Sequence, residues 1–392
     1  MVSGRPTVRK QPKATLDLVR PDMSALGLSA RARKARELGK RAVSLARSHP
    51  RMVVPRSGYP RRTIDGVMVL QRGENPSTDY YLRQRLRASG LAGEIVDVAD
   101  DPAVSGLLGA GGAQALMVVI CRYAAPAWLE ALERARGRLA RVAFFMDDDL
   151  PEMMRAREIP ASARGKVALH FGAHVERLSA LASEVWVSTP ELAARYAGAR
   201  PSVLGPLPEA EPPEPAAHDA KLVVYHGTDV HPRERRFVLE VAREVSAGSP
   251  GARFEVIGDK TLARAAAGAG AVEIAPQLSW PDYLETQSGR SAAISLAPLF
   301  PSRLNDARAP VKAIDAARLG AAGLYADAPA YRGHVHDGED GLLLPMEPRA
   351  WAEAITGLLA DPDRRLRLAR TARGRLAQAL RDDGGFPAAP AG

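Results

Sequence analysis

The segment 292–326 constrains the fold of this chain more than any other stretch. It contains an apolar run of strand length, a polar loop, a helical stretch over 309–320 and a second apolar run over 322–326. Pro310 falls in the first turn of the predicted helix and Gly320 follows its end. Proline is common in the first turn of helices, and glycine is common just after the last. The order strand, loop, helix, strand predicts a parallel crossover unit. In such units the loop after the first strand lies at the carboxyl edge of the sheet, where open α/β proteins bind ligands.

Charged residues around the start of this helix have the chemistry of a clamp for a phosphate and a sugar. Arg308 and Lys312 lie four residues apart, so they are predicted to share one face of the helix near its free N–H groups. Asp315 is expected on the next exposed turn, where its carboxylate can accept hydrogen bonds from sugar hydroxyls. The alternative interpretation is a solvated helix face, because such charge pairs are common on exposed helices.

The same alternation of apolar and amphipathic segments runs along most of the chain and predicts two α/β domains. Residues 62–204 are expected to form the first domain and residues 221–392 the second, with a proline-rich hinge over 205–220. A long helical region is expected over roughly 161–182. The strands of the first domain are expected at 66–70, 94–98, 115–121, 142–146 and 184–188.

The net charge of +9 comes from an N-terminal extension, residues 1–61, and not from the two domains. Residues 1–62 hold 16 of the 54 Lys and Arg residues and 3 of the 45 Asp and Glu residues, so the remainder is slightly acidic. This distribution argues against nucleic-acid binding by the folded body, and a nucleic-acid-binding arm is the weakest alternative. Residues 29–48 are predicted to form a basic amphipathic helix. It would contact an anionic membrane surface, dock on the body of the protein or do neither.

The sequence also indicates a compartment. No run reaches the ~18 apolar residues of a membrane span, and the N-terminus lacks the apolar stretch of a signal peptide. The single cysteine, Cys121, rules out an internal disulfide framework and is expected to pack in the core. We therefore expect a cytoplasmic protein, with any membrane contact of residues 29–48 at the inner face.

A run of acids follows an apolar strand of the first domain. Asp147, Asp148 and Asp149 are adjacent, and their mutual repulsion suggests a function. Asp148 and Asp149 are therefore candidates for orienting a substrate hydroxyl or taking a proton. The alternatives are a metal site of oxygen ligands and a helix N-cap. His170 and His174 lie four apart on a predicted helix, but a zinc site needs a further ligand that we do not find.

A short turn, His226-Gly227-Thr228, follows the first strand of the second domain. Glycine lets the backbone approach a ligand closely, and the Thr228 hydroxyl can donate to a phosphate oxygen. The alternative is a tight turn that only leads into the next helix. Its place between a strand and a helix, at the edge where α/β proteins bind ligands, favours a functional role.

The C-terminal half of the chain has the marks of a known family. A carboxylate on a helix, Asp315, is followed five residues later by Gly320, and the next strand ends in a small residue and Asp327. A glycine-rich stretch and a short apolar strand follow over 331–345. Residues 220–380 resemble the donor-binding part of group 1 glycosyltransferases of the GT-B type.

The resemblance departs from the family pattern at one of two paired glutamates. Asp315 stands in the place of the second glutamate, but Ala307 occupies the place of the first. A divergent branch of the family uses Asn, Arg and Lys in this region, and Asn305, Arg308 and Lys312 resemble that branch. Two alternatives therefore stay open. One is a GT-B protein that binds a glycan or a partner without chemistry, and the other is a nucleotide-sugar epimerase of the same fold.

The resemblance implies an α/β protein of the GT-B fold, with two Rossmann-like domains whose parallel sheets face each other across a cleft. It implies a retaining glycosyltransferase of polysaccharide biosynthesis that takes a nucleotide-diphosphate sugar and needs neither a metal nor a cofactor. The acceptor would be a glycan, a lipid-linked glycan or a protein. The donor-binding residues are expected to be His226, Gly227, Thr228, Asn305, Arg308, Lys312 and Asp315. The catalytic residues are expected to be Asp148, Asp149 and Lys312.

Overall fold

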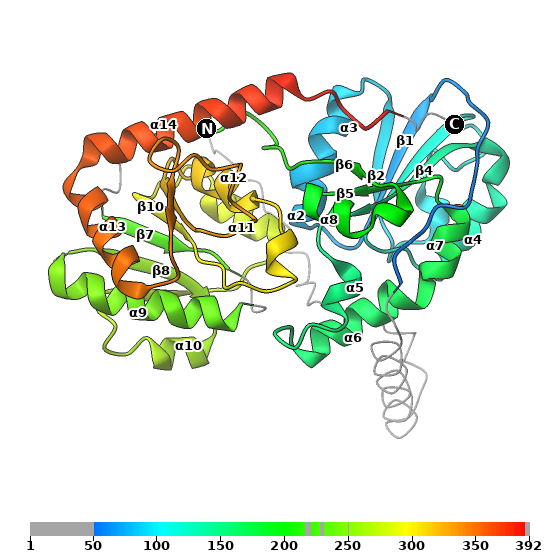
Figure 1. Ribbon diagram of the computed structural model, residues 1–392. Coiled ribbons are helices and arrows are strands. Elements are labelled where there is room, and N and C mark those ends of the chain that lie inside the picture. The colour runs from blue at the N-terminus through cyan, green and yellow to red at the C-terminus, as the bar shows by residue number, and fades with distance from the viewer. Residues whose placement is uncertain (1–50, 216–220, 228–230, 250, 389–392) are drawn as a thin grey trace, which may run out of the picture.

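Each half of the chain forms a lobe built on a six-stranded parallel sheet in this computed structural model (Figure 1). The structure describes residues 51–215, 221–227, 231–249 and 251–388. The predicted basic helix over 29–48 and the Thr228 hydroxyl lie outside these described residues. Two parallel α/β lobes are the architecture expected of the GT-B fold, and this prediction of the fold class is confirmed.

The sheet of the first lobe has the order β2-β1-β3-β4-β5-β6, and all of its strands are parallel. Its central strands are buried along their whole length, which explains why they read as continuous apolar runs. The two-residue strand β6 was not predicted. The strands are β1 (Gly66–Gln71), β2 (Ala92–Asp97), β3 (Leu116–Cys121), β4 (Leu139–Met146), β5 (Glu184–Val187) and β6 (Ser202–Val203).

The helical region predicted over 161–182 is present, but it is interrupted and consists of three helical elements. The chain breaks at Phe171, whose fully buried ring stacks on Phe144 with 5.7 Å between ring centroids. Gly172 then passes Met154 so closely that a Cβ atom there would lie 2.7 Å from the Met154 methyl carbon. The helical elements of this lobe are α2 (Pro76–Thr78), η1 (Asp79–Arg83), α3 (Gln84–Ala88), η2 (Pro102–Val104), α4 (Pro126–Arg134), η3 (Arg136–Arg138), α5 (Leu150–Met153), α6 (Ala161–His170), η4 (Gly172–His174), α7 (Val175–Leu181), α8 (Pro190–Arg195) and η5 (Ala197–Ala199).

The sheet of the second lobe has the order β12-β11-β10-β7-β8-β9, again all parallel. The edge strand β9 was not predicted as a strand. The strands are β7 (Leu222–Tyr225), β8 (Arg253–Gly258), β9 (Val272–Pro276), β10 (Ile294–Ala297), β11 (Ala322–Ala326) and β12 (Leu342–Leu344). The helical elements are α9 (Pro232–Gly248), α10 (Lys260–Ala265), α11 (Trp280–Gln287), η6 (Asn305–Ala307), α12 (Val311–Arg318), α13 (Pro348–Ala360) and α14 (Pro362–Asp382).

The direction of winding reverses once in each sheet. In the first lobe the reversal falls between β1 and β3, and in the second lobe it falls between β7 and β10. Connections leave these neighbouring strands toward opposite faces of the sheet, so a crevice opens beyond their carboxyl ends. The residues that follow these four strands are therefore the first places to look for ligand-binding groups.

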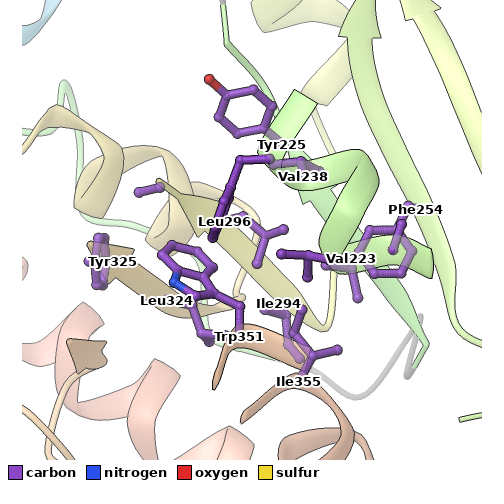
Figure 2. Close-up of a cluster of buried hydrophobic side chains, with 14 of the residues drawn as sticks. Val223, Tyr225, Val238, Phe254, Ile294, Leu296, Leu324, Tyr325, Trp351 and Ile355 are labelled. Carbon is purple, nitrogen blue, oxygen red and sulfur yellow. The ribbon is translucent and has the colours of Figure 1, made fainter. Parts of the chain in front are cut away.

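The second lobe has a core of aliphatic and aromatic side chains between its sheet and helices α9 and α13 (Figure 2). Trp351 of α13 is fully buried in this core, and its ring packs edge to face on Phe237 of α9 with 5.4 Å between centroids. Its indole N–H donates to the Pro345 carbonyl at 2.8 Å. The tryptophan thus satisfies its one polar atom while it fills the space between helix and sheet.

The C-terminal end of the chain returns to the first lobe (Figure 1). After α14, Asp383 accepts from Arg85 Nη2 at 2.6 Å, and Phe386 stacks on Trp186 of β5 with 5.6 Å between centroids. In the described part of the proline-rich connector, Leu207 N donates to the Tyr80 carbonyl at 2.7 Å. The C-terminal segment and the start of the connector thus both contact the first lobe. Over the part of the chain that the structure describes, no helix is long and apolar enough to cross a bilayer.

We predict that Trp351→Ala lowers the free energy of unfolding by about 3–5 kcal/mol, since it leaves a large cavity in the second lobe. Chemical denaturation followed by circular dichroism measures this loss. Val104→Ala is the control, because Val104 is 60% exposed and its truncation should change stability by no more than ~0.5 kcal/mol. Equal stabilities of the two variants would contradict this view of the core.

Candidate functional site

The two lobes meet through residues that follow the carboxyl ends of their strands. Thr189, just after β5, donates its hydroxyl to the Ala307 carbonyl at 3.0 Å. Trp280, at the start of α11, donates its indole N–H to Asp79 Oδ2 at 2.6 Å. The Tyr80 hydroxyl donates to the Asp315 carboxylate. The carboxyl edges of the two sheets therefore face each other.

Asp315 is the most heavily bonded of these groups. Its carboxylate accepts from Lys312 Nζ at 2.9 Å, from Arg318 Nη1 at 3.0 Å and from the Tyr80 hydroxyl. Only 6% of the residue is exposed, so the prediction of an exposed turn is wrong: α12 turns this face toward the first lobe. Burial alone would raise the pKa of Asp315, but Lys312 and Arg318 outweigh it and lower the pKa below its ordinary value.

Lys312 connects the segments that follow β7 and β10, the two strands between which the sheet order of the second lobe reverses. Besides its bond to Asp315, its ammonium group donates to the His226 carbonyl at 2.6 Å. His226 follows β7, and Lys312 lies in the first turn of α12, which follows β10. The predicted partners of a clamp, Lys312 and Asp315, are thus in direct contact at the predicted edge of the sheet.

The spacing predicted that Arg308 and Lys312 share one face of a helix, but Arg308 lies outside the helix. It lies in extended backbone before α12, with φ −74° and ψ 148°, because the helix begins only at Val311. Its Nε donates to Asn305 Oδ1 at 3.0 Å, and its Nη1 lies 3.9 Å from Asp148 Oδ1 in the first lobe. The guanidinium group therefore reaches across the interface.

Asn305 positions Arg308. Its amide nitrogen donates to the Phe300 carbonyl at 2.9 Å, while its amide oxygen accepts from Arg308. Both ends of the buried amide are therefore used within the loop. We interpret Asn305 as a residue that orients the arginine rather than one that contacts a ligand.

His231, at the N-cap of α9, is a further member of this cluster. Burial, reinforced by the charges of Arg308 and Lys312, lowers its pKa well below the ordinary value. The imidazole is consequently neutral at physiological pH. The sequence predicts His231 as a helix-start residue rather than a ligand, and the structure places it at the N-cap of α9, directly before Pro232.

Asp147 and Asp148 form a second charged group with Arg122 of the first lobe. Arg122 donates from Nε to Asp147 and from Nη2 to Asp148 at 2.6 Å. Its backbone is left-handed, with φ 64°, which is uncommon for a residue other than glycine and is frequent at functional sites. Burial raises the pKa of Asp147. In Asp148, Arg308 and Arg122 overcome the effect of burial and lower the pKa.

Asp149 has a structural role in the contacts that it makes. Its side chain is fully buried, caps α5 by accepting from Glu152 N at 2.9 Å, and also accepts from Arg195 and from the Tyr196 hydroxyl. Both carboxylate oxygens are therefore engaged. Of the two aspartates proposed for the acceptor side, Asp148 alone points toward the second lobe and contacts it through Arg308.

The His226 imidazole points into the second lobe and not toward the interface. Its Nε2 lies 2.8 Å from Glu255 Oε1 and its Nδ1 lies 3.0 Å from the Tyr283 hydroxyl. A donor contact at this turn would therefore come from the backbone. The packing requires glycine at position 227, since a Cβ atom there would lie 2.5 Å from the Tyr225 hydroxyl oxygen.

Ala307 occupies a place where a carboxylate would be costly. Its side chain is 1% exposed and packs within the apolar core of the first lobe. A glutamate at this position would bury a charge among aliphatic groups unless the loop moved. The apolar packing around position 307 thus favours the alanine found there over the glutamate of the family pattern.

Aromatic rings pack around Tyr80 and Arg318, two of the side chains that hydrogen-bond to Asp315. Trp280 stacks on Tyr283 with 5.5 Å between centroids and meets the edge of Tyr80 at 5.6 Å. The Arg318 guanidinium lies 5.7 Å from the centroids of both the Tyr80 and the Trp280 rings. Tyr80 belongs to η1, a π-helical segment, and such segments are often found at functional sites. Neither Tyr80 nor Arg318 was predicted from the sequence.

No group of three or more His, Cys, Asp or Glu side chains is arranged to hold a metal ion within the residues that the structure describes. Asp147 and Asp148 are instead neutralised by Arg122, and Asp148 also by Arg308. The arrangement can thus bind anionic oxygens on the side of the second lobe and a hydroxyl on the side of Asp148.

Residues 220–361 match the family described as "Glycosyl transferases group 1". This segment covers most of the second lobe and includes Arg308, Lys312 and Asp315. The match covers the part of the chain in which the sequence resembles group 1 glycosyltransferases. Comparison of the sequence with curated proteins found no match.

Several solved structures resemble this chain at low sequence identity. Anabaena Alr3699/HepE, in complex with UDP and glucose, has a TM-score of 0.48 and 13% identity over 80% of this chain and 95% of that one. A glycosyltransferase from Rickettsia africae has a TM-score of 0.47 and 9% identity over 81% and 93%. The pneumococcal O-GlcNAc transferase GtfA, in complex with UDP and GlcNAc, has a TM-score of 0.44 and 12% identity over 69% and 54%.

We predict that Glu255→Gln lowers stability by up to about 3 kcal/mol at pH 7 and that this difference shrinks as the pH falls. The bond with His226, with help from Arg290, lowers the pKa of Glu255 from 4.5 to about 2. The ionised carboxylate thus stabilises the fold above its unfolded pKa, and this stability is lost as the pH approaches 2. Denaturation curves between pH 7 and 3 measure the difference.

The exposed Glu240→Gln, in the same lobe, is the control and should leave stability almost unchanged at every pH. A Glu255→Gln difference that stays constant from pH 7 to 3 would show that this carboxylate is not held ionised by its partners.

Proposed function

We propose that this protein is a glycosyltransferase that moves a sugar from a nucleotide-diphosphate donor to an acceptor hydroxyl. The observation that carries the proposal is the contact of Lys312 with Asp315 where the sheet of the second lobe reverses. Both residues lie in the segment that matches group 1 glycosyltransferases. A cation and a carboxylate at one sheet edge suit a ligand with a diphosphate and sugar hydroxyls.

The reaction breaks the bond between the anomeric carbon and the diphosphate, and it forms a bond to the acceptor oxygen. Negative charge grows on the departing diphosphate, where Arg308 and Lys312 would stabilise it without reorganising. Neutral His231 would add a hydrogen-bonding group without opposing that charge. Asp148 would orient the acceptor hydroxyl and accept its proton as the new bond forms. The resemblance implies retention at the anomeric carbon and no metal.

Donor binding would involve an exchange of hydrogen-bond partners at Asp315. Its carboxylate now accepts the Tyr80 hydroxyl, so a ribose or sugar hydroxyl would take the place of that group. The Tyr80 ring also meets the edge of Trp280, which stacks on Tyr283, so aromatic rings adjoin the tyrosine that the donor would displace. Loss of the contact between Tyr80 and Asp315 would thus accompany donor entry, and closure of the two lobes over the bound donor would exclude water from the reaction.

A second candidate is a GT-B protein that binds a glycan or partner without chemistry. The buried alanine at position 307, in place of a glutamate, favours this alternative. Release of a nucleoside diphosphate from nucleotide sugars, with and without a glycan acceptor, separates the two candidates. Conversion of the donor without any acceptor and without such release would indicate an epimerase.

Lys312→Ala should lower the rate of nucleoside diphosphate release by roughly 10²–10³-fold, because one charge-stabilising donor is lost. A panel of nucleoside diphosphates is screened first by thermal shift, since a ligand that binds the folded state raises its midpoint. The release rate is then measured with the nucleotide sugar selected. Lys260→Ala is the control, as Lys260 is an exposed lysine of the same lobe. A wild-type rate for Lys312→Ala would remove Lys312 from the mechanism.

Tyr80→Phe should tighten nucleoside diphosphate binding by roughly tenfold, equivalent to about 1.4 kcal/mol. The variant lacks the hydroxyl that competes for Asp315, and a hydrogen bond to a charged group is worth about 1.5–3 kcal/mol. Isothermal titration calorimetry measures the affinity. Tyr59→Phe is the matched control, since the Tyr59 hydroxyl donates to the Leu181 carbonyl within the first lobe. Unchanged or weaker binding by Tyr80→Phe would show that the tyrosine does not compete with the ligand.

A further inference from the structure

We infer that the first lobe helps to build the donor site of the second lobe. Thr189 and an apolar pocket of the first lobe hold the loop over residues 300–308, here called the donor loop, and thereby position Arg308. The inference rests on the proposed function for the word donor, whereas the seating of the loop on the first lobe is tested separately. Thr189 is therefore a positioning residue that acts through Arg308.

The apolar side chains of the donor loop are buried in the other lobe. Leu299, just before the loop, belongs to the core of the second lobe. Leu304, only 1% exposed, is instead buried against Ala156 and Ile159 of the first lobe. Ala307 likewise lies among the core residues of the first lobe. Burial of these groups stabilises the loop only where it contacts the first lobe, because water would cover them if the lobes separated.

The Thr189 hydroxyl supplies a directional contact at the same place. It donates to the Ala307 carbonyl at 3.0 Å and accepts from Leu192 N at 3.2 Å, so one buried hydroxyl caps α8 and holds the other lobe. The peptide plane that contains the Ala307 carbonyl also contains the nitrogen of Arg308. The hydrogen bond therefore orients the backbone from which the arginine side chain extends.

The start of the donor loop is held by its own lobe. The Arg233 guanidinium lies over the Phe300 ring, 4.2 Å from its centroid. The end of the loop contacts the first lobe at Leu304, Ala307 and Arg308. The part of the loop that carries the arginine thus depends on the first lobe for its position.

An ion pair between Arg303 and Glu152 also crosses the interface, at 3.2 Å. The Arg303 side chain is 64% exposed, however, and exposed ion pairs contribute little to stability. The buried Thr189 hydroxyl and the buried Leu304 side chain therefore hold the loop more strongly than this pair does.

The seating of the loop links the charge of Arg308 to the contact between the lobes. While the lobes are apart, Thr189 cannot reach the Ala307 carbonyl, and the arginine is not fixed. As the lobes close over a donor, the same contacts place Arg308 where the leaving diphosphate gains negative charge. Full stabilisation of that charge is thus confined to the closed protein, from which water is excluded.

Hydrogen exchange followed by mass spectrometry on the full-length chain tests the seating itself, because exchange reports local opening. The amides of residues 306–308 donate to carbonyls within the loop, so they exchange when the loop opens. Thr189→Val removes the hydroxyl at nearly constant volume, and Leu304→Ala removes the apolar contact. Each should raise the exchange rate of these amides at least fivefold. Thr189→Ser keeps the hydroxyl and should stay within twofold of wild type.

Asp101→Ala is the control for the loss of a helix cap. The Asp101 carboxylate accepts from Ala103 N at 2.9 Å and caps η2 within the first lobe. This variant loses a cap of the same lobe, as Thr189→Val does, but it should leave exchange in the donor loop unchanged.

Affinity for a nucleoside diphosphate shows whether the seating acts through Arg308. The probe is whichever of UDP, GDP and ADP raises the unfolding midpoint most. Thr189→Val should bind this probe roughly tenfold more weakly in isothermal titration calorimetry, and Thr189→Ser should bind within twofold of wild type. The Thr189→Val effect should persist in a Lys312→Ala background. It should fall to less than twofold in an Arg308→Gln background, because the group that Thr189 positions is then absent.

The inference is overturned if Thr189→Val and Leu304→Ala leave exchange in the donor loop unchanged. It is also overturned if Thr189→Val weakens binding equally in the Arg308→Gln and Lys312→Ala backgrounds, since the substitution would then disturb the protein generally and not through Arg308. Binding of none of the three nucleotides, with faster loop exchange in Thr189→Val, would contradict the proposed function and leave the seating of the loop standing.

Discussion

A buried, ionised carboxylate holds the centre of this molecule together. Asp315 is charged in a place from which water is excluded, and such a charge persists only when several donors surround it. Lys312 and Arg318 come from its own helix, but the Tyr80 hydroxyl comes from the other lobe. The need to satisfy one carboxylate thus links the two lobes at the edge where each sheet ends.

The charges on either side of this link are complementary. The second lobe presents Arg308 and Lys312 beside a neutral His231, and the first lobe presents Asp147 and Asp148 beside Arg122. A ligand with anionic oxygens and hydroxyls can replace these contacts between the lobes one by one, because it offers the same kinds of partner. The interactions that hold the two lobes together are therefore of the same kind as those that would bind the proposed substrates.

Much of the architecture could be predicted from periodicity, because parallel strands buried on both faces appear as uninterrupted apolar runs. The errors fell where tertiary contacts override local pattern. The helical region over 161–182 is interrupted at the buried Phe171, and Asp315, expected on an exposed turn, is buried because its helix faces a second lobe. The edge strands β6 and β9 were missed, since they are short or only partly buried and lack a clear apolar pattern.

The sequence by itself determined the two-lobed α/β class, the crossover unit that carries Lys312 and Asp315, and the segment that matches group 1 glycosyltransferases. These features depend on order along the chain, which a sequence states directly. Only the tertiary structure decided that Asp149 caps a helix, that Arg308 reaches Asp148, and that Tyr80 meets Asp315 from 235 positions away. Contacts of this range depend on how two separately folded sheets are placed, and no local pattern of residues encodes that placement.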